Sequence, residues 1–401
     1  MSASKQILVL TEAWPPTSGG VATSAQRIST NLAKLGVGVT VFTFDSSRQV
    51  TDPEYELESR EGDVEIVKFG PFFLKRPSEE IRGLSEKHRA IMRRRVFDAM
   101  EARAQKQSIA GILSFYVVNA GWLATYLSRS LNVPHILGVR GNDIGRNIFA
   151  SDRLAPVTLA VENASAIACV NEHLRRRLLL AFPKVAAKSR VILNATNILQ
   201  TGQSRENTRE NIAHQTGWSV SSPWAVFIGT PREKKGLRNL LDAMLSLPDD
   251  HELKLLCIGP EPGALDMRVC GAQWKRLKEC GRLFCTGQLL RSDALQIAAG
   301  GDIVVMPSVE DGLANGLLEG MALGLCPVAS DIFADVLKDG ENGLIFQRGN
   351  TPALANALHR AASDSQLRND LGAAAQQLAI ARHSPCREAE DYLQVLRDLG
   401  I

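Results

Sequence analysis

The sequence predicts an α/β protein of two domains. Short apolar runs that end at glycine, proline or acidic residues alternate with longer stretches of helical periodicity, as in proteins whose strands and helices alternate around parallel sheets. With 401 residues, the chain is long for one hydrophobic core and suits two domains of ordinary size. Hydrophobic residues make up 45% of the chain and charged residues 22%, which is typical of a globular protein.

The first strand is predicted at residues 7–10. It leads into a proline-rich loop that contains Gly19 and Gly20, after which apolar residues follow at helical spacing as far as Gly36. The two glycines leave the backbone open to close approach by a phosphate or a sugar, and the helix would contribute the positive end of its dipole. An ordinary strand-to-helix turn without a ligand is the alternative interpretation.

Further strands of the first half are predicted at residues 39–44, 64–69, 111–115, 135–139, 166–170 and 191–193, with the polar run 45–63 as a loop. Residues 81–107 suit a helix and hold eight Lys and Arg against three acidic residues. These basic residues, 82–106, form either a solvated face or a face toward a membrane or an anionic acceptor. Because no aromatic residues are interleaved with them in a nucleic-acid-binding pattern, we expect no nucleic acid partner.

The turn after the strand at 135–139 carries a charged pair. It reads Arg-Gly-Asn-Asp and places Arg140 and Asp143 directly after that strand. The fixed cation of Arg140 could bind a phosphate bidentately but could not relay a proton. The alternative is an arginine that caps a loop carbonyl.

The two halves of the chain differ in charge and are expected to meet near residue 198. Residues 1–200 hold 26 Lys and Arg against 18 Asp and Glu, a net charge of +8, whereas residues 201–401 hold 20 against 25, a net charge of −5. The strand at 191–193 leads to Asn194, and the polar run 201–222 opens the second domain.

A second strand-to-helix turn, after a strand at 225–228, carries cations. Gly229 opens the turn, and Arg232 and Lys235 stand three residues apart before a helix that starts at residue 237. Arg232 as a bidentate donor and Lys235 as a point charge form a plausible clamp for a diphosphate, with Lys234 in solvent. The next strands are predicted at 253–258, which ends at Gly259, and at 283–286, followed by Gln288 and Leu289.

The greatest density of chemically active residues lies at 307–330. A strand at 303–306 leads into a carboxylate-rich turn and a helix at 315–323, and the next strand opens at 327. Asp311 precedes the helix, and Glu319 follows Asp311 by eight residues. Glu310 lies nine residues before Glu319. Strand-to-helix switches hold ligands in α/β sheets, and N–H groups at a helix start would face an anion.

This segment resembles the Glu-x7-Glu signature of retaining glycosyltransferases of glycosyltransferase family 4. Asp311 takes the place of the first Glu and Glu319 is the second, and the family's small residues, glycine and Pro-Val follow in step. The register favours Asp311 over Glu310 for the first role. The family also carries a similar glycine loop after its first strand, and an Arg and a Lys that bind the donor diphosphate. Arg140 departs from the pattern, because the family usually has His there.

The resemblance implies the GT-B architecture, two Rossmann-like domains that face each other across a cleft. Residues 1–198 would bind the acceptor, together with a C-terminal helix, 386–401, that crosses back to them. Residues 199–385 would bind the nucleotide sugar. The expected function is retaining transfer of a sugar from a nucleotide diphosphate sugar to an acceptor hydroxyl or other nucleophile. No metal and no cofactor are expected, since cations and a helix start can neutralise the diphosphate.

By the same resemblance, the expected site residues fall into two groups. The catalytic group is Asp311, Glu319, Arg232 and Lys235. The donor-binding group is Gly19, Gly20, Arg140, Asp143, Gly229, Gly259, Gln288, Leu289, Glu310, Gly312, Leu313, Ala314 and Asn315.

Three alternatives share some of these features. A nucleotide-sugar epimerase or hydrolase of the same architecture would keep the nucleotide contacts. A non-catalytic subunit that binds sugar nucleotides would explain the departures at Arg140 and Asp311. A glycosidase with paired carboxylates would leave the cations and glycine loops without an anion to hold.

The location expected from the sequence is cytoplasmic, with peripheral contact at the inner face of a membrane as one option. The first residues contain no apolar segment of the signal-peptide type, and no stretch approaches the ~20 apolar residues of a membrane span. Seven cysteines without metal-site spacing are expected as reduced, mostly buried thiols. The base, the sugar, the acceptor and the oligomeric state stay open.

Overall fold

The structure is a computed structural model that describes residues 6–17, 19–45, 55–70, 86–197, 204–248 and 251–401. The chain divides into two compact units. The first comprises Met1–Asn194 and Pro385–Ile401, and the second comprises Ala195–Ser384. The boundaries expected from the sequence, at 198/199 and 385/386, lie close to these.

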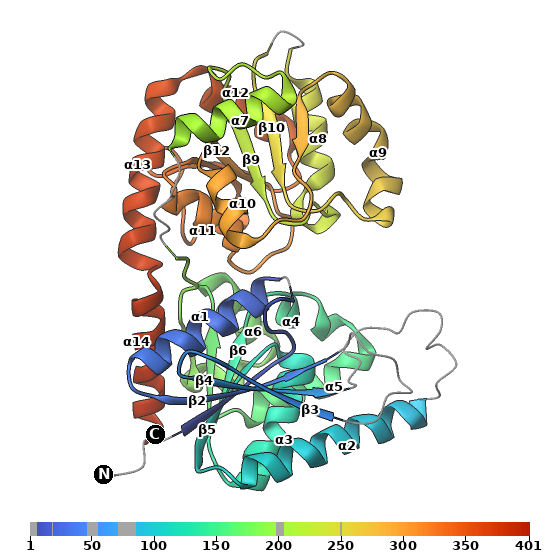
Figure 1. Cartoon of the computed structure of the whole chain (residues 1–401), viewed down its shortest axis with the longest axis vertical. Coiled ribbons are helices and arrows are strands. Elements are labelled where there is room, and N and C mark those ends of the chain that lie inside the picture. The colour runs from blue at the N-terminus through green and yellow to red at the C-terminus, as the bar shows by residue number, and fades with distance from the viewer. Residues whose placement is uncertain (1–5, 18, 46–54, 71–85, 198–203, 249–250) are drawn as a thin grey trace. The chain divides into compact units, whose positions relative to one another are not determined.

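The first unit is an eight-stranded sheet covered by helices (Figure 1). The strand order is β3-β4-β2-β1-β5-β6-β7-β8, and every neighbouring pair is parallel except β3 with β4. Its strands are β1 (Gln6–Thr11), β2 (Gly38–Phe44), β3 (Tyr55–Glu61), β4 (Val64–Gly70), β5 (Ile109–Phe115), β6 (His135–Val139), β7 (Ala166–Cys169) and β8 (Ser189–Val191). Its α-helices are α1 (Gly20–Lys34), α2 (Glu86–Gln105), α3 (Trp122–Leu131), α4 (Asn142–Gly145), α5 (Ser151–Asn163), α6 (Glu172–Ala181) and α14 (Pro385–Asp398).

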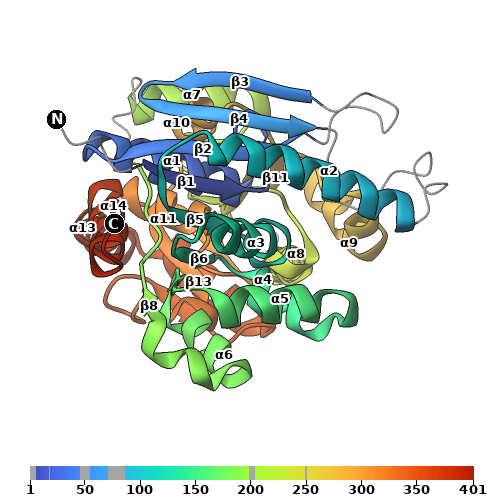
Figure 2. The same ribbon diagram turned by 90° about the horizontal axis from the view of Figure 1, so that it is seen from below.

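Both faces of this sheet are buried, which explains why its central strands are continuous apolar runs. Along β1, Ile7 and Val9 pack into a cluster with residues of α1 and α14. Leu8 and Leu10 point to the other face and pack with residues of α2 and α3. Figure 2 shows α1 and α14 on one side of the sheet and α2 and α3 on the other.

The C-terminal helix belongs to the first unit, as expected. Ala389, Tyr392 and Val395 lie on one face of α14 and are buried in the cluster that includes Ile28 of α1. In Figure 1, α14 therefore lies beside α1, although the two helices come from opposite ends of the chain. This packing fixes the end of the chain to the first unit.

The second unit is a six-stranded sheet in which every neighbouring pair is parallel. The strand order is β11-β10-β9-β12-β13-β14. Its strands are β9 (Trp224–Ile228), β10 (Lys254–Ile258), β11 (Leu283–Cys285), β12 (Ile303–Met306), β13 (Cys326–Ser330) and β14 (Leu344–Phe346). Its α-helices are α7 (Arg205–Thr216), α8 (Leu237–Ser246), α9 (Ala264–Glu279), α10 (Arg291–Ala298), α11 (Asn315–Ala322), α12 (Thr351–Ser363) and α13 (Ser365–Arg382). The α/β class and the two Rossmann-like units are confirmed.

The structure differs from the sequence prediction at three elements. β3 lies inside the run 45–63 that was predicted as a loop; it is an edge strand whose side chains are largely exposed, so its sequence lacks an apolar face. α7 lies in the polar run 201–222, where the Ser204 side chain caps its start and Gly217 in the left-handed conformation ends it. The strand predicted at 191–193 lies earlier, at β8, because the exposed Arg190 interrupts its apolar pattern.

Three other expectations can be compared with the structure. The helix predicted at 81–107 is α2, and residues 71–85 before it lie outside the described residues. All seven cysteines are free, and Cys169, Cys257, Cys270 and Cys326 are buried. Within the described ranges, no helix is both long enough and apolar enough to span a bilayer.

Candidate active site

The candidate site lies where the strand order of the second unit changes direction. From β9 the chain moves to β10 on one side, and it later returns to place β12 on the other side. In open α/β sheets, the carboxyl ends of the strands at such a point form the ligand crevice. The turn after β9 carries Arg232 and Lys235, and the turn after β12 carries Glu310 and Asp311.

These two turns are packed directly against each other. The backbone N–H groups of Val309 and Glu310 donate to the carbonyl oxygen of Lys234 at 2.9 and 3.1 Å. Gly236 has a φ of +73°, and a Cβ there would stand 2.0 Å from the Pro307 carbonyl oxygen. Only glycine fits this approach, so Gly236 allows the cation turn to reach the carboxylate turn.

The contact brings Lys235 and Asp311 together. Lys235 Nζ lies 3.3 Å from Asp311 Oδ2, and their side chains are 20% and 18% exposed. Asp311 also accepts from the Gly312 backbone N–H at 2.9 Å and from the Ser308 hydroxyl at 3.4 Å. Ser308, which is fully buried, has no signal in the sequence pattern. A cation and an oriented carboxylate thus lie side by side, partly shielded from water.

The neighbouring charged residues differ in exposure. Arg232 is exposed, so its side chain is accessible to an anionic ligand. Lys234, expected in solvent, is instead partly buried, because the carboxylate turn covers its backbone. Burial lowers the pKa of Lys234, an effect that the nearby Asp311 carboxylate opposes. The turn therefore concentrates more positive charge near Asp311 than the sequence pattern indicates.

Glu310 and Asp311 are distinguished by their partners. Asp311 forms the ion pair with Lys235, whereas Glu310 Oε1 is buried and has no hydrogen-bond partner among the described residues. Both side chains are partly buried. Asp311 is thus the one of the two with a cation beside it, and its first carboxylate role stays a prediction.

We predict that Asp311→Asn lowers kcat/KM by roughly 10- to 100-fold, because it removes one charged hydrogen-bonding partner worth about 1.5 to 3 kcal/mol. Glu310→Gln is expected to stay within about threefold of the parent, a change of under about 1 kcal/mol. Steady-state kinetics of the two variants under saturating acceptor measures the difference. Loss of turnover in Glu310→Gln with activity retained in Asp311→Asn would reverse the assignment.

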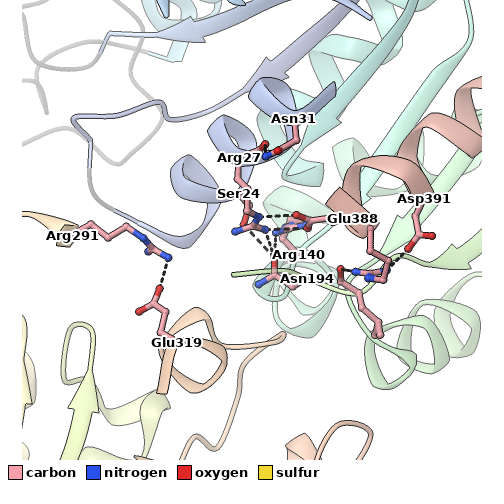
Figure 3. A network of polar contacts seen from close by, with 11 residues as sticks. Ser24, Arg27, Asn31, Arg140, Asn194, Arg291, Glu319, Glu388 and Asp391 are labelled. Atoms are coloured by element: carbon pink, nitrogen blue, oxygen red, sulfur yellow. Dashed lines mark hydrogen bonds and ion pairs between the residues drawn. The ribbon is translucent and has the colours of Figure 1, made fainter. Parts of the chain in front are cut away.

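Glu319 lies on α11 and is paired with an arginine. Its side chain is 4% exposed, and the Arg291 guanidinium, from the first residue of α10, approaches Glu319 Oε1 to 2.5 Å (Figure 3). The two residues are far apart in the sequence, so no local pattern signals the pair. A buried carboxylate held by a guanidinium is a fixed anionic group.

The glycines of the donor-binding group form a close backbone contact. The Gly229 N–H donates to the Ile258 carbonyl at 2.9 Å, and Gly259 pairs with Gly287 after β11. A Cβ at Gly259 would stand 2.4 Å from the Gly229 carbonyl oxygen, so this approach requires glycine. The turns after β9 and β10 thus meet through backbone atoms.

The remaining expected residues of the second unit differ in what they expose. Gln288 is exposed and Leu289 is partly buried in the turn after β11. Leu313 and Ala314 are buried, so only their backbone could meet a ligand. Gly312 is buried beside Asp311, and Asn315 begins α11, a helix without a side-chain cap.

In the first unit, the loop after β1 and the loop after β6 are built differently. Gly19 and Gly20 are exposed, and α1 begins at Gly20. Asp143 is fully buried, and its carboxylate accepts from the backbone N–H groups of Arg140, Gly141 and Ile144 at 2.8, 2.6 and 3.2 Å. Asp143 therefore shapes its own loop.

Arg140 points into the interior of the first unit (Figure 3). Its side chain is 6% exposed, with Nη2 2.6 Å from Asn194 Oδ1 and Nη1 3.9 Å from Glu388 Oε1 of α14. The guanidinium also lies over the Phe115 ring. Because these groups already surround the cation, the placement favours a structural role over the expected contact with the donor diphosphate.

A residue without a place in the expected site lies at the end of β1. Glu12 is partly buried, and its carboxylate accepts from the Asn119 backbone N–H at 3.3 Å. Burial raises the pKa of Glu12 to about 7. Nearby Tyr116, which directly follows β5, has a φ of +82°, a strained conformation that is concentrated at functional sites. These groups lie at the carboxyl ends of β1 and β5, where the strand order of the first sheet changes direction.

Comparisons with known proteins identify what the two units resemble. A family model described as Glycosyltransferase Family 4 matches residues 18–198, and one described as Glycosyl transferases group 1 matches residues 222–364. Together the two models cover most of both units. The chain is a glycosyltransferase of the family 4 type.

One relative and two solved structures of similar length resemble this chain. The D-inositol 3-phosphate glycosyltransferase of Corynebacterium urealyticum is 24% identical over 412 residues, covering 97% of this chain and 93% of its own. Sucrose-phosphate synthase of Thermosynechococcus elongatus superposes with a TM-score of 0.78 at 19% identity, covering 98% of this chain and 99% of its own. HepE of Anabaena in complex with UDP and glucose superposes with a TM-score of 0.75 at 17% identity, covering 98% of this chain and 100% of its own. The GT-B fold is confirmed, and the protein is a glycosyltransferase.

Proposed function

We propose that this family 4 enzyme transfers a sugar, with retention at the anomeric carbon, from a nucleotide diphosphate sugar to an acceptor hydroxyl or other nucleophile. The observation that carries the proposal is the contact of Lys235 with Asp311 at the change of strand direction in the second unit. It brings a phosphate-binding type of cation beside a sugar-binding type of carboxylate. A similar structure, HepE, is solved in complex with UDP and glucose, which supports a donor of this class.

The proposed donor contacts follow from charge. Arg232 is exposed and can bind a phosphate bidentately, and Lys235 adds a point charge three residues later. The start of α11, which has no side-chain cap, would direct its positive end at the same anion. These groups would stabilise the diphosphate as it leaves, and their charge makes transfer without a metal ion the proposed mode.

The two carboxylates would bind different parts of the donor. Asp311 would hold sugar hydroxyls, with its carboxylate oriented by Ser308 and the Gly312 N–H. Glu319, buried on α11, would hold the ribose. As the diphosphate departs, the sugar would pass through an oxocarbenium-like state, and the acceptor would attack from the same face. Hexosyl transfer fits these contacts.

The acceptor would belong to the first unit, whose half of the sequence carries a net charge of +8. Gly19 and Gly20 are exposed at the start of α1, where a phosphate or sugar could approach the backbone. The basic helix α2 remains a candidate surface for an anionic acceptor or a membrane. A cytoplasmic location, with α2 at the inner face of a membrane, is part of this proposal.

Turnover of a nucleotide sugar in the presence of an acceptor tests the proposal. We expect a glycosylated product with the anomeric configuration of the donor, measured by NMR, and the same rate in excess EDTA. An inverted product would contradict the retaining mode, and a rate abolished by EDTA would contradict metal independence. Release of nucleotide or isomerised sugar at the same rate without any acceptor would identify the hydrolase or epimerase instead.

A further inference from the structure

Arg291 connects two parts of the proposed donor site. It is the first residue of α10 and follows directly on the turn that holds Gln288 and Leu289. Its guanidinium reaches Glu319 on α11, with Nη2 2.5 Å from Oε1 (Figure 3). The Arg291 side chain is 38% exposed, whereas that of Glu319 is 4% exposed. The cation thus lies between solvent and a buried carboxylate.

The surroundings of Glu319 make this pairing important for the carboxylate. Glu319 is 4% exposed, so its carboxylate is largely removed from water. A carboxylate in such surroundings is unfavourable unless a cation lies beside it, because burial removes its hydration. Arg291 supplies that cation and restricts the directions in which the carboxylate can turn.

The carboxylate is neutralised but still lacks a hydrogen-bond donor at one oxygen. Oε1 of Glu319 is buried and has no hydrogen bond within the described residues, because the close approach of Arg291 does not have hydrogen-bond geometry. A buried acceptor without a donor in a native protein calls for an explanation. A ligand that carries hydroxyl groups would supply the missing donors.

We propose that Arg291 is a positioning residue that fixes Glu319 for the ribose hydroxyls of the nucleotide and so makes the site select ribonucleotides over 2′-deoxyribonucleotides. This inference rests on the proposed function, in which Glu319 contacts the ribose. Without Arg291, nothing fixes the direction of the carboxylate, and its contact with the 2′-hydroxyl weakens. The two kinds of nucleotide then bind alike.

Titrations of ribonucleotides and their 2′-deoxy counterparts test the inference. Full-length parent and Arg291→Gln are titrated with UDP, GDP and ADP and with dUDP, dGDP and dADP by calorimetry. For the base that the parent accepts, we expect the parent to prefer the ribonucleotide by about tenfold or more, the range of one charged hydrogen bond. Arg291→Gln should reduce this ratio to within about twofold, and Arg291→Lys should restore part of it because the charge returns.

A kinetic measurement separates positioning from a general loss of structure. Arg291→Gln should raise the KM for the nucleotide sugar about tenfold or more and change kcat less than threefold, because the affected contact is to the ribose and not to the reacting carbon. Arg205 offers a matched control. It is the first residue of α7, and its side chain is 46% exposed. It pairs with Asp302, whose side chain is 13% exposed. Asp302 directly precedes β12, so this pair lies at the amino end of that strand, whereas the candidate site lies at the carboxyl ends. Arg205→Gln should keep the ribose preference of the parent.

The outcomes distinguish failure of the proposed function from failure of the role of Arg291. If the parent binds none of the nucleotides, the proposed function fails. If the parent binds one but does not prefer ribose, or if Arg291→Gln keeps the full preference, the role of Arg291 is overturned and the donor site stands. Loss of preference in Arg205→Gln as well would also overturn it, because the effect would then be general.

Discussion

Glu388→Ala is expected to lower the free energy of unfolding of the first unit by about 3–5 kcal/mol, because it leaves buried cations without their carboxylate. Arg27 on α1 donates to both carboxylate oxygens of Glu388 on α14, with distances of 2.7 Å from Nε to Oε2 and 3.0 Å from Nη2 to Oε1. The side chain of Glu388 is fully buried, and that of Arg27 is 4% exposed.

Arg140 adds a second positive charge to the same carboxylate. Its Nη1 lies 3.9 Å from Glu388 Oε1, and Asn194 Oδ1 accepts from both Arg27 and Arg140 (Figure 3). One carboxylate therefore lies beside two guanidinium groups. The cluster lies where the chain leaves the first unit, at Asn194, and re-enters it, at Pro385. Truncating Glu388 leaves both buried cations without a carboxylate.

Urea unfolding of the parent and the variant measures this change. Glu390→Ala is the matched control, because Glu390 is exposed on the same helix two residues away, and surface substitutions usually stay within about 0.5 kcal/mol. A loss below about 1 kcal/mol in Glu388→Ala would mean that the cluster does not hold α14 in place.

Lys235→Ala is expected to lower kcat/KM by roughly 30- to 1000-fold, because a charge-assisted contact to the leaving diphosphate is worth about 2–4 kcal/mol in the transition state. Lys235 is positioned for this contact by Gly236, which packs on Pro307, and by the ion pair with Asp311. Most of the effect should appear in kcat, since the negative charge on the diphosphate grows as the bond to the sugar breaks.

Initial rates with varied donor at saturating acceptor check this result. Lys275→Ala provides a control on the same unit, because Lys275 is 75% exposed and pairs only loosely with Glu279 along α9. The control should match the parent. Activity of Lys235→Ala within twofold of the parent would remove Lys235 from the diphosphate site.

Much of the fold could be predicted from the sequence because both sheets are buried on both faces. Continuous apolar runs such as residues 39–44 and 303–306 can only be core strands when turns bound them. β3 and α7 were missed for the opposite reason. Both are polar elements at the surface, held by pairing with β4 in one case and by end caps in the other, so their sequences carry no buried face.

Within the candidate site, the sequence indicates individual candidate residues but not their pairings. Asp311, Glu319, Arg232 and Lys235 were singled out by residue type, turn position and resemblance to family 4. The pairs Lys235–Asp311 and Arg291–Glu319 join elements that are distant in the sequence, and such contacts depend on strand order. Arg140 shows the same limit, because its partner Glu388 arrives from the far end of the chain.

Thermal unfolding of the full chain with a panel of nucleotides and nucleotide sugars tests the central claim most directly. The claim is that the second unit binds the donor through its nucleotide diphosphate. We predict that nucleotides of one base, and the corresponding nucleotide sugars, stabilise the parent by about 2.7 kcal/mol at a hundred times the dissociation constant. A parent that no member of the panel stabilises at millimolar concentration would contradict the account.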